Sequence, residues 1–369
     1  MEGRPISGPV PPPGLAQSLA RLGPLYWQAR LGRWWAPPAS EPADGYSLLL
    51  PVPGDLPVFL RLALAVCAHQ DSRHRVETVV VPDRMTPEVR RLVDEARPGW
   101  DGPLVLAPLR WPERQVLPRL GNPGRNHAVQ LVTGVQASRA THIVLHDADL
   151  FLLSSGALDR QYELARDGSL ACVGISPPWD PWYREHGLEL AATWELCARV
   201  DWLRKFPPYM HMAHRAKMFG EQHMFDTTFR AQSLTDPELV AVQGTDDVVH
   251  FNYVISNYRN FLRRGPSPWC DGIFRLTLVS VFVELFDPSN RRTYQLPTLR
   301  DLAGCLGREG GAVTFPGQEA AARYAEFRRL LGRALCGPWT GPEEQERLVG
   351  ALAPFDDFYG VAEVPAAGR

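Results

Sequence analysis

Hydrophobic and polar residues alternate with two different periods from Tyr46 onward. Four short runs are apolar on both faces, as strands of parallel sheets are, and they cover residues 46–52, 76–83, 102–109 and 141–149. Three segments between them carry apolar residues at helical spacing, namely 57–70, 86–96 and 124–138. Thr86 and Pro87 suit the N-cap and the first helical position of the second segment. The pattern predicts strands that alternate with helices.

Strands and helices that alternate with short links predict an α/β fold, with a mostly parallel, Rossmann-like sheet and helices on both faces. Ligands of such sheets bind beyond the carboxyl ends of the strands. Polar residues follow the predicted strands at 51–55, 83–84, 110 and 147–149. We expect these residues to meet at one edge of the sheet, where a nucleotide would lie.

Changes in composition divide the chain into three regions. Residues 1–44 form a Pro-rich extension, in which a short amphipathic stretch predicts a helix that docks through three tryptophans, Trp27, Trp34 and Trp35. Residues 45–265 form the α/β domain. Residues 266–369 are expected to be mainly helical and to pack on this core.

The composition is that of a soluble globular protein, with 45% hydrophobic and 22% charged residues. The formal net charge of −2 gives no general attraction to nucleic acid or to an anionic membrane. The longest apolar run, residues 276–286, is too short to cross a bilayer, and residues 1–14 lack the apolar core of a secretory signal. We therefore expect a cytoplasmic protein without a transmembrane segment and without a nucleic-acid partner.

The stretch THIVLHDADLFLL (141–153) places two carboxylates one residue apart where an apolar strand ends. In extended geometry Asp147 and Asp149 would face the same point. Two carboxylates that close repel each other unless a cation lies between them. The pattern is consistent with a divalent-cation site, or with an acidic turn that faces water. The chain has neither GxGxxG nor GxxxxGK[ST], so a classical dinucleotide or P-loop site is not expected.

Three stretches in this order resemble the family 2 glycosyltransferases, over about residues 46–265. SLLLPVPGDLPVFLRLALAVCAHQ is similar to their first strand and helix, and VETVVVPDRMTPEVRRLVDEA to their second strand and the helix after it. LGNPGRNHAVQLVTGVQASRATHIVLHDADLFL resembles their Gly-x-x-x-Ala-Arg-Asn helix and DxD strand. Gly124 replaces the usual Ala of this helix, while Arg125 and Asn126 match.

This resemblance implies a GT-A fold, a nucleotide-diphosphate sugar donor and a divalent metal, Mn²⁺ or Mg²⁺. It also implies that Asp149 binds the metal and that Asp147 contacts the ribose or the metal. A metal held by oxygen ligands neutralises the leaving diphosphate.

For the donor, the resemblance assigns Asp83 to the nucleobase or the ribose, and Pro51 to the lining of the same pocket. Pro82 stands where many family members have a second Asp, which leaves the nucleobase open. Arg125, near a predicted helix N-terminus, would add a contact to phosphate.

An inverting member of the family needs a carboxylate base from an acidic pair that opens a downstream helix. We expect Asp247, or else Asp246, in this role, at the start of a helix through Val248, Phe251, Val254, Ile255 and Tyr258. Arg259 would match the Arg that family members carry on this helix. The alternatives are that both residues only cap the helix, or that Glu221 is the base.

Some GT-A enzymes complete their metal site with a downstream His, and the resemblance assigns this role to His250, one helical turn after the acidic pair. His211, His214 and His223 have no ligand spacing and are expected to be structural. The aromatic segment 176–202 is either a wall that binds the acceptor or a lid over the core.

The predicted function is a metal-dependent, inverting glycosyltransferase whose acceptor is a natural product, a glycan or a lipid-linked sugar. A retaining transferase and a non-catalytic sugar-nucleotide-binding protein remain alternatives. A nucleotidyltransferase is disfavoured, because the PVPGDLP turn after the first strand has no basic residue.

Overall fold

The computed structural model describes residues 23–32, 35–37, 41–120, 123–244, 246–264, 270–299, 302, 317–335 and 337–361. Its centre is a seven-stranded sheet in the order β10-β6-β7-β4-β1-β2-β3. These strands are β1 (Ala43–Val52), β2 (Arg75–Pro82), β3 (Leu104–Leu106), β4 (Ala140–His146), β6 (Cys172–Gly174), β7 (Glu195–Arg199) and β10 (Val240–Val242). β7 runs antiparallel to β4 and β6, and the other pairs are parallel. The predicted α/β class with a mostly parallel sheet is confirmed.

Alternate side chains of the buried strands enter two separate cores, because successive residues of a strand point to opposite faces. Leu48 and Leu50 belong to one core and Leu49 to the other. The first core receives α2 (Pro57–Ala68), α3 (Pro87–Ala96) and α6 (Ala157–Asp167). The second receives α4 (Trp111–Leu120), α5 (Pro123–Ala137) and α8 (Val200–Lys205). Helices therefore cover both faces, as predicted.

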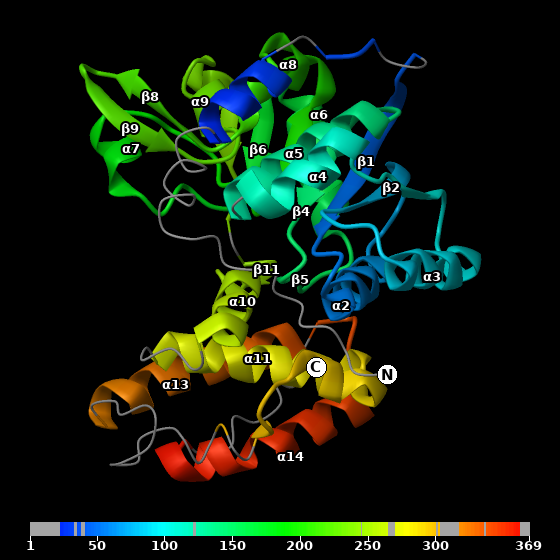
Figure 1. Cartoon of the computed structure of the whole chain (residues 1–369), viewed down its shortest axis with the longest axis vertical. Coiled ribbons are helices and arrows are strands. Elements are labelled where there is room, and N and C mark those ends of the chain that lie inside the picture. The colour runs from blue at the N-terminus through cyan, green and yellow to red at the C-terminus, as the bar shows by residue number, and fades with distance from the viewer. Residues whose placement is uncertain are drawn as a thin grey trace.

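The C-terminal helices extend the first core below α2 (Figure 1). They are α11 (Cys270–Phe286), α13 (Gly317–Leu335) and α14 (Pro342–Tyr359), with the 3₁₀ helix η4 (Pro288–Tyr294) after α11. α13 is joined to α14 by a buried ion pair in which Arg328 Nε lies 3.1 Å from Asp356 Oδ1. The described part of this region is helical, while the boundaries at residues 44 and 265 stay a prediction. No helix among the described residues has both the length and the apolar character needed to cross a membrane.

The N-terminal helix docks on the second core. In the described residues it covers 23–31, and Trp27 is completely buried. Trp35 Nε1 donates a hydrogen bond of 2.8 Å to the carbonyl of Phe206. Docking through Trp27 and Trp35 is therefore confirmed, and Trp34 lies outside the described residues.

The second strand–helix unit begins as its sequence indicates. The Thr86 hydroxyl accepts a hydrogen bond of 3.2 Å from the Val89 N–H, so Thr86 is the N-cap of α3. Gly54, in the turn after β1, lies against the backbone after β2. A Cβ at this position would be 1.6 Å from the Arg84 carbonyl oxygen, so only glycine fits between the two strand ends.

Two predicted elements are wrong. The strand predicted over 141–149 ends at His146, and a turn leads into the short strand β5 (Leu150–Leu152). The helix predicted to start at the Asp246–Asp247 pair is instead the strand β11 (Val248–His250), which pairs antiparallel with β5. The helix after it, α10, covers Val254–Arg264. Pairing with β5 explains the difference, because short apolar runs take their structure from tertiary contacts.

The remaining elements are a hairpin, two short helices and three 3₁₀ turns. The hairpin of β8 (His214–Met218) and β9 (Glu221–Phe225) projects from the main sheet beside α7 (Pro181–Glu185) (Figure 1). The smaller elements are α9 (Phe229–Gln232) and three 3₁₀ turns, η1 (Arg97–Gly99), η2 (Pro208–His211) and η3 (Pro237–Leu239).

Acidification from pH 7 to pH 4.5 is expected to destabilise the fold through His211. The ring is buried, and burial lowers its pKa to about 4. Between about pH 6.5 and 4 the unfolded chain binds a proton that the folded chain does not. The contribution of His211 to the free energy of unfolding is therefore fully present above pH 6.5, and it is lost as the pH falls toward 4, by up to about 3 kcal/mol. Urea unfolding at several pH values measures the slope of the free energy of unfolding against pH.

The variant His211→Gln should flatten the slope over that interval, since Gln does not titrate. The matched control is His69→Gln at an exposed position, which should leave the slope as it is. An identical slope for the parent and His211→Gln would contradict the prediction.

Candidate active site

The two carboxylates that follow β4 lie in a tight turn rather than in an extended strand. The Leu150 N–H donates to the Asp147 carbonyl over 3.1 Å, and the Asp147 N–H donates to the Trp194 carbonyl over 2.9 Å. The first bond closes the turn, and the second fixes it to the neighbouring strand β7. Asp147 and Asp149 nevertheless share one neighbourhood.

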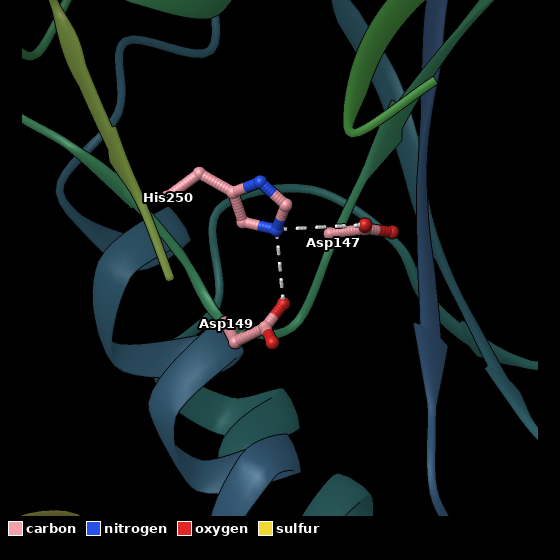
Figure 2. A group of neighbouring side chains, drawn as sticks. All are labelled: Asp147, Asp149 and His250. Atoms are coloured by element: carbon pink, nitrogen blue, oxygen red, sulfur yellow. Dashed lines mark ion pairs between the residues drawn. The ribbon is translucent and has the colours of Figure 1, made fainter. Parts of the chain in front are cut away.

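His250 completes this group from the last position of β11. Its Nε2 lies 3.4 Å from Asp149 Oδ1 and 3.9 Å from Asp147 Oδ2. Figure 2 shows the ring nitrogen directed toward both carboxylates. One ligand atom from each of the three residues lies within 4.8 Å of the others, and no second group of this kind occurs among the described residues. The structure therefore brings Asp147, Asp149 and His250 together.

A second histidine, His127 near the start of α5, lies on the other side of Asp147. Its Nε2 is 3.2 Å from Asp147 Oδ1. Burial alone would lower the pKa of His127, but the Asp147 carboxylate outweighs burial and holds that pKa above its ordinary value. Burial would likewise raise the pKa of Asp147, but His127 and His250 hold it below its ordinary value. Asp147 is therefore ionised at neutral pH.

Trp194, directly before β7, and Glu195, the first residue of β7, hold parts of this group in place. The Trp194 ring packs against the His250 ring with 4.7 Å between centroids, while its carbonyl holds Asp147. Glu195 Oε2 is 2.5 Å from His146 Nδ1, and both side chains are buried. This contact fixes the end of β4 next to Asp147. Trp194 thus contacts both Asp147 and His250, and Glu195 contacts His146 next to Asp147.

The donor set fits a divalent cation such as Mn²⁺ or Mg²⁺. Carboxylate oxygens suit both ions, and imidazole suits Mn²⁺ as well. Neighbouring ligands of an octahedral ion are about 3 Å apart if each bond is about 2.1 Å. The separations of 3.4 and 3.9 Å are wider than this, so the side chains would move closer together around a bound ion. His250 Nδ1 is buried without a hydrogen-bond partner, so no bond among the described residues holds the ring in another orientation. Metal binding itself stays a prediction.

The group lines a cleft of about 230 Å³ at the carboxyl edge of the sheet. Pro51 and Asp83 line it from the ends of β1 and β2, and Arg259 lines it from α10. The Asp83 carboxylate accepts a hydrogen bond of 2.8 Å from the Gly54 N–H. Arg259 Nη2 lies 3.4 Å from Asp83 and 2.5 Å from Asp55. Asp83 is thus held at the cleft wall, near Pro51, while nucleotide binding by these two residues stays a prediction.

Three predicted site residues lie elsewhere. Arg125 is next to Tyr209 and does not line the cleft, although Gly124 and Asn126 beside it do. Asp246 is exposed, and its carbonyl accepts a hydrogen bond from Arg333.

Asp247 also lies outside the cleft, and its side chain is 40% exposed. Its carboxylate is 2.5 Å from Arg160 Nη2. Burial would raise the pKa of Asp247, but hydrogen bonds from Arg160 and Ser154 outweigh it, so the pKa lies below its ordinary value. These contacts make Asp247 a poor proton acceptor for a reaction in the cleft.

The base alternative Glu221 also lies outside the cleft, where it accepts a hydrogen bond of 2.5 Å from Trp182 Nε1. Instead the cleft contains Asp226, which the sequence pattern did not indicate. Asp226 follows β9, and the Thr227 N–H donates to its Oδ1 over 2.7 Å. Its charge helps to hold the pKa of His127 above the ordinary value.

The three other histidines have separate surroundings. His211 is buried against the Leu203 carbonyl, and His214 contacts the Met212 carbonyl. His223 stacks on Trp182 with 3.7 Å between centroids. Within segment 176–202, Trp179 and Trp194 line the cleft, whereas Trp182, Tyr183 and Trp202 pack away from it. The segment is thus partly a cleft wall and partly a support.

No protein-family model matches the chain, and no curated protein matches it. Among solved structures, the mannosyltransferase PcManGT from Pyrobaculum calidifontis, in complex with GDP-Man and Mn²⁺, is 15% identical with a TM-score of 0.40, over 96% of this chain and 99% of that chain. S. aureus TarS is 13% identical with a TM-score of 0.37, over 86% of this chain and 49% of TarS, so the matched part is about half of TarS. Glucosyl-3-phosphoglycerate synthase from Mycobacterium tuberculosis, in complex with Mn²⁺, UDP and phosphoglyceric acid, is 12% identical with a TM-score of 0.38, over 64% of this chain and 78% of that chain. The function proposed below rests on the geometry of the site.

Proposed function

We propose that the protein is a metal-dependent glycosyltransferase with a GT-A fold, which transfers a sugar from a nucleotide-diphosphate donor with inversion. One observation carries this proposal. Asp147, Asp149 and His250 converge at the carboxyl edge of a mostly parallel sheet, in a cleft that also contains Asp83. Ligands of such sheets bind at that edge, and a divalent ion held there would neutralise the charge of a leaving diphosphate.

The β1–β2 side of the cleft supports the position of the nucleotide. Asp83 is buried and is held by the Gly54 N–H and by Arg259. A carboxylate fixed in this way can accept hydrogen bonds from a ribose hydroxyl or a base N–H. Pro51 and Pro53 supply a rigid apolar wall beside it. We assign Asp83 and Pro51 to the nucleotide.

Asp226 fits the role of general base better than Asp247 does. An inverting transfer needs a carboxylate that takes the proton of the acceptor hydroxyl while this oxygen attacks the anomeric carbon. Asp226 lines the cleft with the proposed metal ligands, and Thr227 orients its side chain. Asp247 is ion-paired with Arg160 outside the cleft.

The proposal is tested by calorimetric titration of the protein with UDP and GDP, in Mn²⁺ and in EDTA. We expect one of the two nucleotides to bind in Mn²⁺ and to lose at least tenfold in affinity in EDTA, because the diphosphate then lacks its cation. A panel of UDP- and GDP-sugars should show slow, Mn²⁺-dependent hydrolysis. Equal affinity in both buffers, or no binding of either nucleotide, would overturn the proposal.

A matched pair of variants locates the nucleotide. Asp83→Ala should weaken binding, since its carboxylate lies in the cleft wall, whereas Arg125→Ala should not, since Arg125 lies beside Tyr209 outside the cleft. The reverse result would place the nucleotide at the N-terminus of α5.

A further inference from the structure

The order of the strands divides the cleft into two sides. β1 and β2 lie on one side of β4, and β7 and β6 lie on the other. Asp147, directly after β4, is therefore in the middle. The first side contains Asp83 after β2. On the second side lie Trp179, which follows β6, and Thr193, which precedes the antiparallel β7. A nucleotide on the first side leaves the second side for another ligand.

Trp179 is an exposed aromatic side chain on a fixed loop. It lines the cleft, yet 67% of it is exposed. The next residue, Asp180, caps α7 by accepting a hydrogen bond of 3.0 Å from the Trp182 N–H, and it lies 3.3 Å from His223 Nε2. The loop is therefore attached both to α7 and to the hairpin. The backbone next to the Trp179 ring is thus fixed, which lowers the ordering cost when this ring stacks on a ligand.

The charges around Trp179 indicate an uncharged ligand. Asp226 lines the cleft directly after the strand β9, which Tyr183 Oη holds through a hydrogen bond of 3.0 Å to the Met224 carbonyl. Arg259 is the one Arg or Lys that lines the cleft among the described residues, and it is paired with carboxylates on the β1–β2 side. An anionic ligand would face Asp226 with no carboxylate-free Arg or Lys in the described cleft lining to receive it, and an alkyl chain would desolvate this carboxylate.

A sugar ring meets both conditions, because it has an apolar C–H face and hydroxyl groups. Aromatic rings bind the apolar C–H face, and carboxylate, hydroxyl and amide groups bind the hydroxyl groups of the sugar. Asp226, Thr193 and Asn252 supply such groups in the cleft lining. We propose that the β6–β7 side binds a sugar ring of an uncharged glycan acceptor, with Trp179 stacked on its apolar face. This inference rests on the proposed function and gives it an acceptor class.

The test uses the full chain with Mn²⁺ and the nucleotide that binds. Methyl glucoside, methyl mannoside, methyl galactoside and methyl N-acetylglucosaminide are measured by saturation-transfer NMR, with glucose 6-phosphate as the anionic probe. We expect at least one neutral glycoside to bind and to bind more tightly than the phosphate. Trp179→Ala should weaken that binding about tenfold or more, as removal of a central aromatic contact does, and Trp179→Phe should restore most of it.

Trp111→Ala is the matched control, because Trp111 on α4 is 66% exposed and does not line the cleft. It should leave glycoside binding unchanged. The inference is overturned if no neutral glycoside binds, if glucose 6-phosphate binds more tightly, or if the Trp179 and Trp111 variants behave alike. Nucleotide binding separates failure of the acceptor class from failure of the proposed function. If the nucleotide binds in Mn²⁺ while the glycoside result fails, only the acceptor class is wrong; if the nucleotide does not bind, the proposed function fails as well.

Discussion

Replacement of Asp149 by alanine is expected to lower the affinity for Mn²⁺ by a factor on the order of 10² or more, and to abolish Mn²⁺-dependent transfer. Loss of residues that only support a metal ligand costs about 10- to 100-fold, so loss of a ligand should cost at least as much. The Asp149 side chain is 10% exposed and lies 3.4 Å from His250 Nε2. Titration of the metal-free protein with Mn²⁺, followed by calorimetry, measures the affinity directly.

The matched control is Asp246→Ala, which removes an exposed carboxylate outside the cleft and should leave Mn²⁺ affinity unchanged. Asp149→Asn keeps the shape of the side chain and removes its charge. Its affinity for Mn²⁺ should therefore be close to that of Asp149→Ala if charge is decisive. Wild-type affinity for Mn²⁺ in Asp149→Ala would remove this residue from the proposed site.

The second large effect is expected for Asp226→Asn, with a loss of transfer by a factor on the order of 10²–10⁴, the usual contribution of general-base catalysis. The amide cannot accept the acceptor proton, whereas nucleotide binding on the β1–β2 side should change little. A fall in kcat at nearly constant donor KM is the expected pattern. Initial rates with the donor found by the nucleotide titration provide the measurement.

Asp247→Asn is the control that separates the two assignments. Its carboxylate is bound to Arg160 outside the cleft, so its loss should affect stability more than rate. A large kinetic loss in Asp247→Asn but not in Asp226→Asn would reinstate Asp247 as the base. The anomeric configuration of the product is the companion observation, because a retained configuration would exclude an inverting base at either position.

The sequence predicts most of the fold because its local signals agree with its tertiary contacts. The apolar strands, the Thr86–Pro87 start of α3 and the edge that collects Asp83 and Asp147 all follow from residue pattern. The prediction fails for β11. Val248 and Phe251 are apolar at a spacing that also suits a helix, and only pairing with β5, about 100 residues earlier in the chain, makes the segment from Val248 a strand.

The candidate site divides in the same way. Asp147 and Asp149 are separated by one residue in the sequence, so their pattern is visible. The sequence predicts His250 on a helix that the Asp246–Asp247 pair opens, yet it reaches the two carboxylates from a strand. Asp226 carries no local signal, since a single Asp after a hairpin strand is common, and its place depends on how that hairpin packs. His127 could have been found, because it follows the matched Arg125–Asn126 pair at the helix end that faces the strand ends.

The antiparallel pairing of β5 with β11 determines which changes of chain length the site can tolerate. Leu150 pairs with His250, and Leu152 pairs with Val248. A shift of this pairing by one residue would turn His250 to the opposite face of the ribbon, away from both carboxylates. Insertions between β10 and β11, before the pairing begins, would leave His250 in place. The number of residues between Asp149 and the histidine can therefore vary among relatives, and a search for related sites should match the paired strands rather than a fixed spacing.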